Sequence, residues 1–581
     1  MKSVRKKVVP LLLGSCIVSA VKANNDNTFV GTNAGKFNTT GFGNTAVGNS
    51  ALELNQTGSW SVAVGLSALQ NSTVGFNTAV GAAALMANVS GEGNTACGFN
   101  ALTANLTGSN TAVGHFSLSN NTTGGNNTAV GTTALLNNTT GTQNTAMGVN
   151  TLEANVTGNQ NTGVGSDVLV NNVASGNTAM GSLSMQNNSA GAQNTAMGVG
   201  SMQANTAGSD CVAVGFGALQ SNTYGVNNTA VGVSALGSNL TGNNNSAMGV
   251  NALASNTIGI DNTAMGTGAL LGNTTANQNV GVGAYASFSN STGINSTAVG
   301  YSALYSNLAS SNTAMGSYAL SSNTTGINNI GVGVLALSGN ISGTDNVAVG
   351  VNSLTSNTTG LQNIAMGSSS LAANTQSSNV GIGYQTLVAN SSGSNNTALG
   401  TSAGSSLTSG NNNIYVNNTG IASESGVIRI GTGGTQTATF IAGISGATSV
   451  GGLEVFVNAS GQLGTTTSSR KFKEAIDDMG NASDKLLQLR PVKFIYKSDE
   501  EKQIQYGLIA EEVEKIYPEL VVYDADGQTY SIRYHLLPVM LLNELQKEYR
   551  TLKEQEKDIR ELKEVIASLV ARIVVLERSK S

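Results

Sequence analysis

A glycine recurs every 16 or 17 residues from Gly31 to Gly400, which gives 23 glycines at nearly constant spacing. The four residues before it usually read Asn-Thr-Ala-Val, as at 44–47 and 127–130. A fixed short period is typical of a solenoid, in which each repeat forms one rung that stacks on its neighbours. The sequence therefore predicts a long rod over most of the chain.

Each repeat approximates Asn-Thr-Ala-Val-Gly-x-x-Ala-Leu-x-x-Asn-x-Thr-Gly-x-x, so two apolar pieces alternate with Asn- and Gly-rich corners that tolerate positive φ. The first piece has a period of two and predicts a strand whose Thr and Val positions fill a thin core. The Ala position is never large, so that face is expected to press against another part of the rung or another chain. The second piece places Leu four residues after the glycine, as at Leu52 and Leu135, and predicts a second inward strand.

Parallel rungs rise about 4.8 Å each, so 23 rungs would span roughly 110 Å. One rung encloses little apolar area, and the rod is expected to need partner chains. The repeat resembles the head repeats of trimeric bacterial surface adhesins and the repeat shafts of phage-type tail fibres. That resemblance implies a homotrimer. The period itself predicts only stacking, either as a single-chain roll or as rungs intertwined among three chains.

Charge divides the chain into compartments. Residues 24–467 contain two basic and ten acidic residues, whereas residues 468–581 contain nineteen and twenty-one. No basic patch is present, so nucleic-acid binding is not expected. Three cysteines (Cys16, Cys97 and Cys211) are too few and too scattered for a disulfide framework or a metal site, and no cofactor is expected. Cys97 occupies a Val position of the repeat and is expected to be a small buried apolar group.

The N-terminus has the pattern of an export signal. Four basic residues precede an apolar run over 8–21, and Val21-Lys22-Ala23 offers small residues at the positions that a signal peptidase needs. A signal peptide over 1–23 is therefore predicted, because the run is too short to span a bilayer comfortably. A lipid anchor on Cys16, in a lipobox-like site, is the alternative. The protein is expected to be secreted or at a cell surface, and its mode of attachment stays open.

The repeats fade after Gly400. A rod over 24–417 is expected to lead into a β-rich neck over 418–467, where β-like runs occur at 427–431, 439–443 and 453–457. The segment 468–581 is charged, with a mixed α and β pattern. The expected fold class is thus mostly β: a parallel β-solenoid or β-roll rod of ~17-residue rungs, a β-rich neck and a small α+β domain that ends in a coiled-coil helix.

The coiled coil is predicted over 537–578 from a heptad of apolar residues that Glu548 and Gln555 interrupt. Helix rules alone favour a dimer, because Ile and Leu alternate in the core; the fibre resemblance implies a trimer. An amphipathic helix packed on its own domain is the alternative. The apolar heptad positions are Leu541, Leu545, Leu552, Ile559, Leu562, Ile566, Leu569, Ile573 and Leu576.

The last 114 residues carry several separated blocks that resemble, in order, the intramolecular chaperone domain of endosialidase-type tail spikes, the S74 peptidase family. In that family a Ser-Lys dyad, five residues apart, cuts the chain next to the serine once the chaperone has folded. The resemblance implies Ser468 and Lys473 as this dyad, although Ser469 stands where the family usually has Asp. Lysine serves as a base when burial or neighbouring cations, here Arg470 and Lys471, favour its free amine.

Nearly interchangeable rungs could pair out of register. A C-terminal template that trimerises first and then severs itself would set the register and make the fibre kinetically stable. We therefore expect an exported trimeric surface or tail-fibre-like adhesin or spacer, which is an enzyme only in one round of serine autoproteolysis. Its expected partners are copies of itself and a host-surface or glycan receptor of unknown identity.

The sequence leaves two other functions open. A glycan-degrading tail spike needs two carboxylates about 5 to 10 Å apart, and only Glu153 and Asp167, on neighbouring rungs, make a plausible pair. Solvated corner residues are the simpler interpretation of both. A membrane-tethered precursor that releases a fragment by self-cleavage is the other alternative, but nothing before Ser468 resembles a DNA-binding domain.

Overall fold

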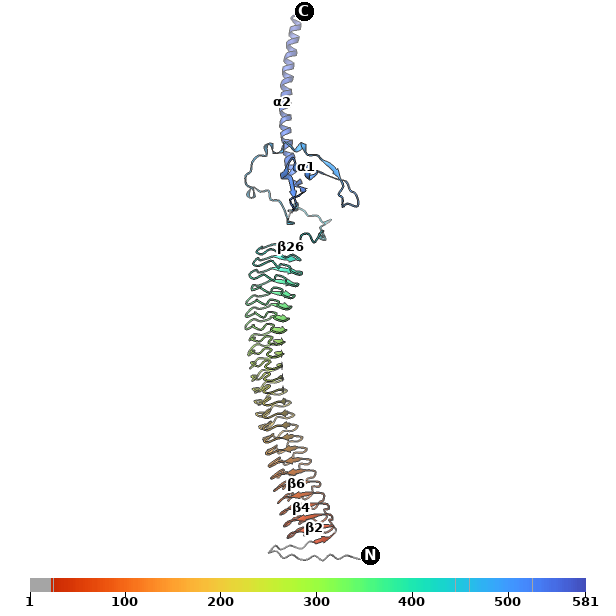
Figure 1. Cartoon of the computed structure of the whole chain (residues 1–581), viewed down its shortest axis with the longest axis vertical. Coiled ribbons are helices and arrows are strands. Elements are labelled where there is room, and N and C mark those ends of the chain that lie inside the picture. Colours follow the sequence, from red (N-terminus) through yellow and green to blue (C-terminus); the bar gives the residue numbers. More distant parts are fainter. Residues whose placement is uncertain (1–21, 25, 445, 459, 525, 581) are drawn as a thin grey trace. The chain divides into compact units, whose positions relative to one another are not determined.

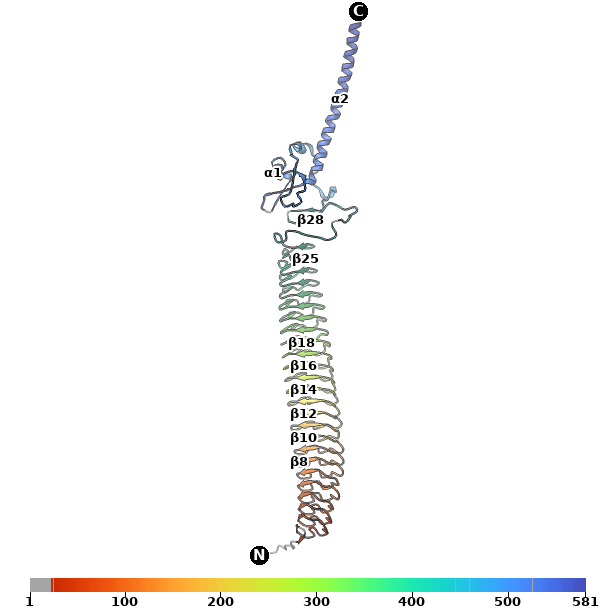
Figure 2. The same ribbon diagram turned by 90° about the vertical axis from the view of Figure 1, so that its right-hand side faces the viewer.

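The computed structural model describes residues 22–24, 26–444, 446–458, 460–524 and 526–580, and the chain forms two compact units, 1–439 and 440–581. The predicted stack of rungs is confirmed in the first unit. Its parallel strands stack one on the next to form a β-solenoid (Figures 1 and 2). Equivalent repeat positions pair between rungs, as where Thr128 lies opposite Thr145 and Ala129 opposite Ala146.

The solenoid strands are mostly three residues long and follow one another in chain order. They are β2 (Asn27–Val30), β3 (Thr45–Val47), β4 (Val62–Val64), β5 (Thr78–Val80), β6 (Thr95–Cys97), β7 (Thr111–Val113), β8 (Thr128–Val130), β9 (Thr145–Met147), β10 (Thr162–Val164), β11 (Thr178–Met180), β12 (Thr195–Met197), β13 (Val212–Val214), β14 (Thr229–Val231), β15 (Ser246–Met248), β16 (Thr263–Met265), β17 (Val280–Val282), β18 (Thr297–Val299), β19 (Thr313–Met315), β20 (Ile330–Val332), β21 (Val347–Val349), β22 (Ile364–Met366), β23 (Val380–Ile382), β24 (Thr397–Leu399), β25 (Ile414–Val416) and β26 (Ile428–Ile430).

At the N-terminal end, β1 (Lys22–Asn24) pairs antiparallel with β2. The predicted cleavage point after Ala23 falls within this strand. Most of the predicted signal peptide, with Cys16, lies outside the described residues.

The solenoid interior is lined by the Ala position, not by the Thr and Val positions. In β9 the central Ala146 is fully buried, whereas Met147 is exposed and Thr145 half-buried. The prediction that Thr and Val fill the core was therefore wrong. This position is Ala or Gly in every strand from β3 to β24, and at Gly163 in β10 an added Cβ would lie 2.6 Å from Thr151 Cγ2. Larger side chains occupy it near the two ends of the rod, Phe29 in β2 and Tyr415 in β25.

The Leu position is interior as predicted, but it does not lie on a strand. Leu52 and Leu135 are fully buried in turns, each with φ of 52°. The backbone of these turns bonds from rung to rung, since Leu135 N–H donates to the Thr151 carbonyl at 3.0 Å. The prediction of a second inward strand was wrong, because an αL leucine turns the chain toward the interior where an extended one would continue past it.

Two ladders of buried asparagines run along the rod and stabilise its corners. In the first, Asn127 Oδ1 accepts the backbone N–H of Asn144 at 2.9 Å. In the second, Asn138 Nδ2 donates to Asn121 Oδ1 at 2.7 Å and to the Gly141 carbonyl at 3.0 Å. Stacked Asn side chains satisfy buried backbone groups that a turn would otherwise leave unpaired.

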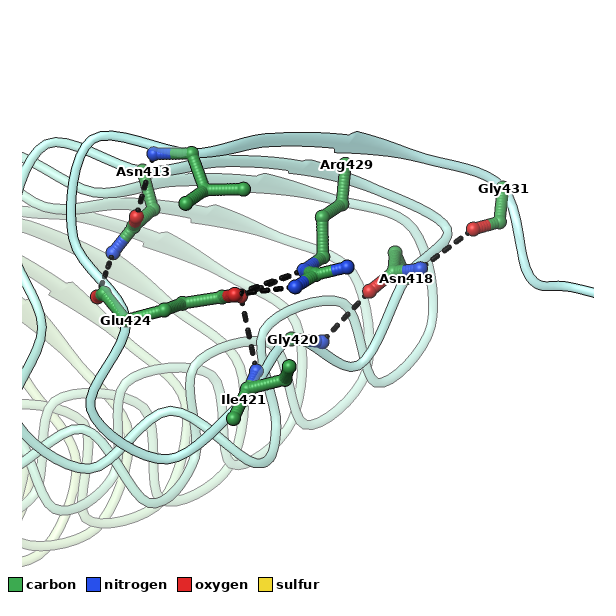
Figure 3. Close-up of polar contacts among 8 residues, drawn as sticks. Asn413, Asn418, Gly420, Ile421, Glu424, Arg429 and Gly431 are labelled. Atoms are coloured by element: carbon green, nitrogen blue, oxygen red, sulfur yellow. Dashed lines mark hydrogen bonds and ion pairs between the residues drawn. The ribbon is translucent and has the colours of Figure 1, made fainter. Parts of the chain in front are cut away.

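Larger and charged side chains occupy the last rungs of the rod, and Figure 3 shows the pair of Glu424 and Arg429 among them. Tyr415 occupies the Ala position of β25 and is fully buried. Glu424 accepts hydrogen bonds from the Arg429 guanidinium at 2.6 to 3.0 Å, and this partner lowers the pKa of the Glu424 carboxyl. Strand β26, which holds Arg429, extends the parallel stack into the segment predicted as neck.

The second unit holds three strand pairs and a long helix. β27 (Phe456–Val457) pairs with β28 (Leu463–Gly464), β29 (Val492–Phe494) with β30 (Gln505–Gly507), and β31 (Val521–Tyr523) with β32 (Thr529–Ile532), all antiparallel. The predicted β-like run at 439–443 is not a strand. The helices are α1 (Ala510–Glu514) and α2 (Leu537–Arg578), with 3-10 turns η1 (Arg470–Phe472), η2 (Gly480–Ser483), η3 (Leu486–Gln488), η4 (Pro518–Leu520) and η5 (Tyr534–Leu536).

Candidate functional site

The serine and lysine implied by the family resemblance lie within hydrogen-bond distance of each other. Lys473 Nζ donates to Ser468 Oγ at 3.2 Å. The turn η1 brings them together, since Phe472 N–H donates to the Ser469 carbonyl at 3.0 Å and Lys473 N–H to the Arg470 carbonyl at 3.1 Å. This separation is suitable for a nucleophile and its base.

The surroundings of this pair are open to solvent in a single chain. Residues 460–482 are exposed throughout, Ser468 and Lys473 among them. Lys471 lies over the Phe472 ring, 4.7 Å from its centre, and it is exposed, so it is not a buried cation beside the dyad. A lysine accepts a proton only as the free amine, a form that water-exposed surroundings disfavour. One chain thus provides the geometry of the dyad without the burial that the chemistry needs.

A polar network connects the segment after the dyad to the base of α2. Ser483, at the end of η2, donates to Glu544 Oε1 at 2.5 Å and accepts from Asn543 Nδ2 at 2.5 Å. Asn543 Nδ2 also donates to the Gly480 carbonyl at 2.9 Å. Lys547 forms ion pairs with Asp484 and Glu544. Because this network includes the only fully buried side chain of η2, that of Ser483, it fixes where the exposed dyad segment ends.

The domain behind this network has a small apolar core. It is built around Val513 of α1, Leu520 and Val521 at the start of β31, and Met540 in the first turns of α2. The Tyr517 hydroxyl accepts the backbone N–H of Lys485 at 3.0 Å, which joins the start of η3 to this core. The core thus anchors the first turns of α2, while the rest of the helix extends beyond it.

Every apolar heptad residue of α2 is exposed in the single chain, from Leu541 to Leu576. An exposed apolar stripe with heptad spacing is typical of a helix that packs against another helix in a coiled coil. The alternative of a helix packed along its own domain holds only for the first turns, around Met540.

A second apolar surface follows the rod. We call it the outer stripe: the first and third residues of strands β3 to β25, whose side chains point away from the interior. Its members include Val47, Met147, Met248 and Leu399, all exposed. Cys97 is the third residue of β6 and is exposed as well, so the expectation that it is buried was wrong. The reason is the same inversion of the strand faces that places Ala inside.

Two other residues singled out from the sequence, Asp167 and Cys211, form contacts within the rod. Asp167 accepts hydrogen bonds from Asn150 Nδ2 and from Ser166 Oγ, both at 2.9 Å. Cys211 replaces an asparagine of the first ladder, and burial raises the pKa of its thiol to about 11. Among the described residues, no three His, Cys, Asp or Glu side chains gather as metal ligands.

Sequence reasoning missed a cluster of aromatic side chains on successive rungs between Tyr285 and Tyr318. The signal was available, because four of the seven rod tyrosines fall within 34 residues of one another, at 285, 301, 305 and 318.

None of the helices in the described part of the chain is long and apolar enough to cross a bilayer.

The comparisons with known proteins agree with the geometry. Residues 468–522 match the family model of the chaperone of endosialidase, peptidase S74. Neither the curated proteins nor the solved structures gave a match. The match begins at Ser468 and includes the dyad, η2, α1 and the start of β31. The chain is thus a tail-fibre-like β-solenoid protein with a C-terminal chaperone domain of the endosialidase type.

Proposed function

We propose that this chain is an exported homotrimeric fibre whose C-terminal domain templates assembly and then releases itself by cutting beside Ser468. The observation that carries the proposal is the 3.2 Å contact between Lys473 Nζ and Ser468 Oγ at the first residue of the family match. The fibre itself acts outside the cell as a spacer and adhesin on a host surface or glycan.

Two exposed apolar surfaces support the trimer. The outer stripe repeats on every rung and is almost free of charge, whereas soluble monomers rarely expose long contiguous apolar patches. The heptad stripe of α2 is equally uncovered. A trimer with cyclic symmetry would cover both with copies of themselves.

A template is needed because the rungs are so alike. Two chains shifted by one rung would lose contacts only at their ends, so many wrong registers lie close in free energy to the right one. The α2 helices and the small domain cores differ from every rung and specify a single alignment. Once three rods have zipped from that alignment, removal of the template prevents a return to the same pathway.

The cleavage step uses only groups of the chain and one water. The Lys473 amine takes the proton of Ser468 Oγ–H, and Oγ attacks the carbonyl carbon of Thr467. The bond from that carbon to the Ser468 nitrogen breaks, the nitrogen takes up a proton, and an ester joins Thr467 to Ser468 Oγ. Water then hydrolyses the ester, which leaves a carboxylate on Thr467 and restores the hydroxyl.

Assembly would supply what a single chain lacks at this site. Three domains packed through α2 would bring other chains against the exposed segment 468–482 and bury Lys473, which favours the free amine. The network from Ser483 to α2 would transmit the packing of the helices to the dyad segment. We therefore expect cleavage only in the assembled state, with a rate that rises with chain concentration.

The test of cleavage is the intact mass of the purified protein and of matched variants. Wild type should give two pieces that meet at Thr467 and Ser468, and Ser468→Ala should stay full length. Ser469→Ala is the control for the neighbouring hydroxyl, and Lys471→Met is the control for Lys473→Met. Mature fibres of uncut wild-type chains, or equal cleavage in Ser468→Ala, would refute the cleavage step. The same spectra would locate the N-terminus and so test the signal peptide over 1–23 and the lipid on Cys16.

The test of the trimer uses the two rod cysteines. Cys97 lies on the outer stripe, whereas Cys211 is buried and its high thiol pKa keeps it from reacting as a thiolate. A short bismaleimide should therefore link chains through Cys97, and Cys97→Ala should abolish the link while Cys211→Ala should not. Failure of Cys97 to cross-link in purified fibres would argue against in-register packing of the outer stripes.

A further inference from the structure

Four tyrosines form a hollow of about 470 Å³ on the side of the rod, over three successive rungs. The ring centres of Tyr285 and Tyr301 lie 6.0 Å apart, and those of Tyr301 and Tyr318 lie 5.3 Å apart. Both pairs meet edge to face, at 87° and 75°. Tyr305 lies four residues after Tyr301 on the same rung, and its ring stacks on that of Phe288 with the ring centres 5.0 Å apart. All four tyrosine rings remain substantially exposed.

Two of these tyrosines occupy a backbone position that disfavours them. Tyr285 and Tyr318 both have φ of 58°, in the left-handed region. The equivalent position of other rungs is mostly Ser, Asn or Gly, as at Ser50, Asn100 and Gly217. A bulky residue there carries a backbone cost that Gly avoids and that Asn tolerates better. Two aromatic residues at this position, two rungs apart with Tyr301 between them, therefore indicate a site that the stacking of rungs does not explain.

The chemistry of the lining is uniform. The remaining walls of the hollow are the serines at 302, 306, 321 and 322, so all of its side chains carry a hydroxyl. The sequence contains no Asp, Glu, Lys, Arg or His between Asp261 and Asp345, and the hollow thus lies in the middle of an uncharged stretch of rod. Such a lining excludes a ligand that depends on ion pairs.

We infer that this hollow binds an uncharged sugar chain. Each hydroxyl both donates and accepts hydrogen bonds, as each hydroxyl of a sugar does. The exposed tyrosine rings offer apolar faces to the C–H faces of pyranose rings while their hydroxyls reach the polar rim. A proline-rich peptide would also suit an aromatic groove, but its backbone offers carbonyl acceptors without matching donors and would leave half of this capacity unused.

The inference rests on the adhesive part of the proposed function and gives it a place on the rod. In a trimer the hollow would occur three times, so that weak single sites would add to a stronger attachment.

The test is binding of the purified, assembled fibre to an array that carries neutral hexose and N-acetylhexosamine oligosaccharides, sialylated oligosaccharides and a proline-rich peptide. Wild type should bind members of the neutral set. The double variant Tyr301→Ser and Tyr318→Ser restores residue types common at these repeat positions, so the rod should fold, and its binding should fall at least about tenfold. Tyr384→Ser removes an exposed tyrosine from the same repeat position as Tyr301, outside the hollow, and should bind as wild type does.

Three results would overturn the inference: no binding to the neutral set, binding only to the sialylated or peptide probes, or equal binding by the double variant. Self-cleavage and Cys97 cross-linking, measured on the same samples, report on assembly separately. A fibre that assembles and cleaves but binds no neutral sugar would refute sugar binding in the hollow and leave the cleavage proposal intact. A fibre that binds sugar through the tyrosines but never cleaves would refute the cleavage proposal and leave sugar binding intact.

Discussion

In the rod, asparagine ladders pair the buried polar groups of each corner and a narrow file of Ala and Leu fills the interior. In the C-terminal domain, a few apolar side chains form the core, while the dyad segment and nearly all of α2 are exposed. The same packing and hydrogen bonds recur on nearly every rung of the rod, so little distinguishes one rung from the next. The domain has distinctive surfaces but leaves them uncovered in a single chain. Under the proposed function the two regions are complementary: the rod supplies nearly identical rungs, and the domain supplies the distinct surfaces that would set their register.

The largest effect should come from separating the two regions. A chain that ends at Thr467 keeps every rung but loses the template, and we expect its yield of correctly assembled trimer to fall at least about tenfold, with the remainder aggregated or out of register. Ser468→Ala is the matched control, because it retains the template but cannot release it. Yield is measured by analytical ultracentrifugation of the soluble fraction. Assembly of the truncated chain at the wild-type rate would end the template proposal.

The next effect is confined to the rod. Gly198 has φ of 139°, and an added Cβ would lie 2.4 Å from the Gly215 carbonyl oxygen of the next rung. Gly198→Ala should therefore destabilise the surrounding rungs by about 3 kcal/mol or more. Hydrogen exchange of the amides in β11 to β13 would measure this, since a stacked array opens locally.

Gly200 provides the control for that substitution. It also has positive φ, at 66°, but an added Cβ would meet nothing closer than 3.8 Å. Gly200→Ala should cost only about 1 kcal/mol, from the backbone conformation alone. Equal losses of stability in Gly198→Ala and Gly200→Ala would mean that contact with the next rung is not what requires glycine at position 198.

In the C-terminal domain the corresponding test is of the helix stripe. Ile566 and Val575 are similarly exposed in a single chain, at 56% and 66%, but only Ile566 belongs to the heptad. In the Ser468→Ala background, Ile566→Asn should weaken self-association at least about tenfold, and Val575→Asn should leave it nearly unchanged. Sedimentation over a range of chain concentrations measures the difference. Identical behaviour of the two variants would mean that α2 is not an assembly surface.

The sequence predicted the stack from its period, yet it inverted the strand faces. Val and Met are more apolar than Ala, so hydrophobicity alone placed them inside. The central position of the strands from β3 to β24 holds only Ala or Gly, and the larger Val and Met residues of these strands lie on the outer stripe. Cys97 was misplaced for the same reason. The apolar residues on the outside of the rungs are informative, because they are the observation on which the proposed trimer of rods depends.

The remaining differences between prediction and structure are conformational. A buried Leu at φ near 50° is rare, so no period of two or of 3.6 could reveal the turn at Leu52. The distance within the dyad was predictable from the spacing and the family resemblance, because the short turn η1 (Arg470–Phe472) lies between Ser468 and Lys473 and brings them together. The exposure of Ser468 and Lys473 in the single chain was not predictable, because the pattern of a sequence does not show which residues around such a turn are buried.

The smallest expected effect compares one Arg–Glu pair from each region. Glu424 and Arg429 close the end of the rod with side chains 11% and 33% exposed, whereas Glu512 and Arg490 are 40% and 64% exposed. Water screens the second pair far more than the first. Glu424→Gln should therefore cost on the order of 1 kcal/mol in the last rungs, and Glu512→Gln should have no measurable effect on its own domain.

Acid should reproduce this difference in the wild-type chain. Arg429 lowers the pKa of Glu424, so the pair stabilises the rod above the pKa of an unfolded glutamate, about 4.3, and that contribution is lost as pH falls through the lowered value. Hydrogen exchange in β25 and β26 should accelerate over this range in wild type, relative to the rungs further along the rod, and the excess should vanish in Glu424→Gln. If β25 and β26 respond to acid as the inner rungs do, the ion pair does not hold the rod closed, and the buried Tyr415 ring alone ends the stack.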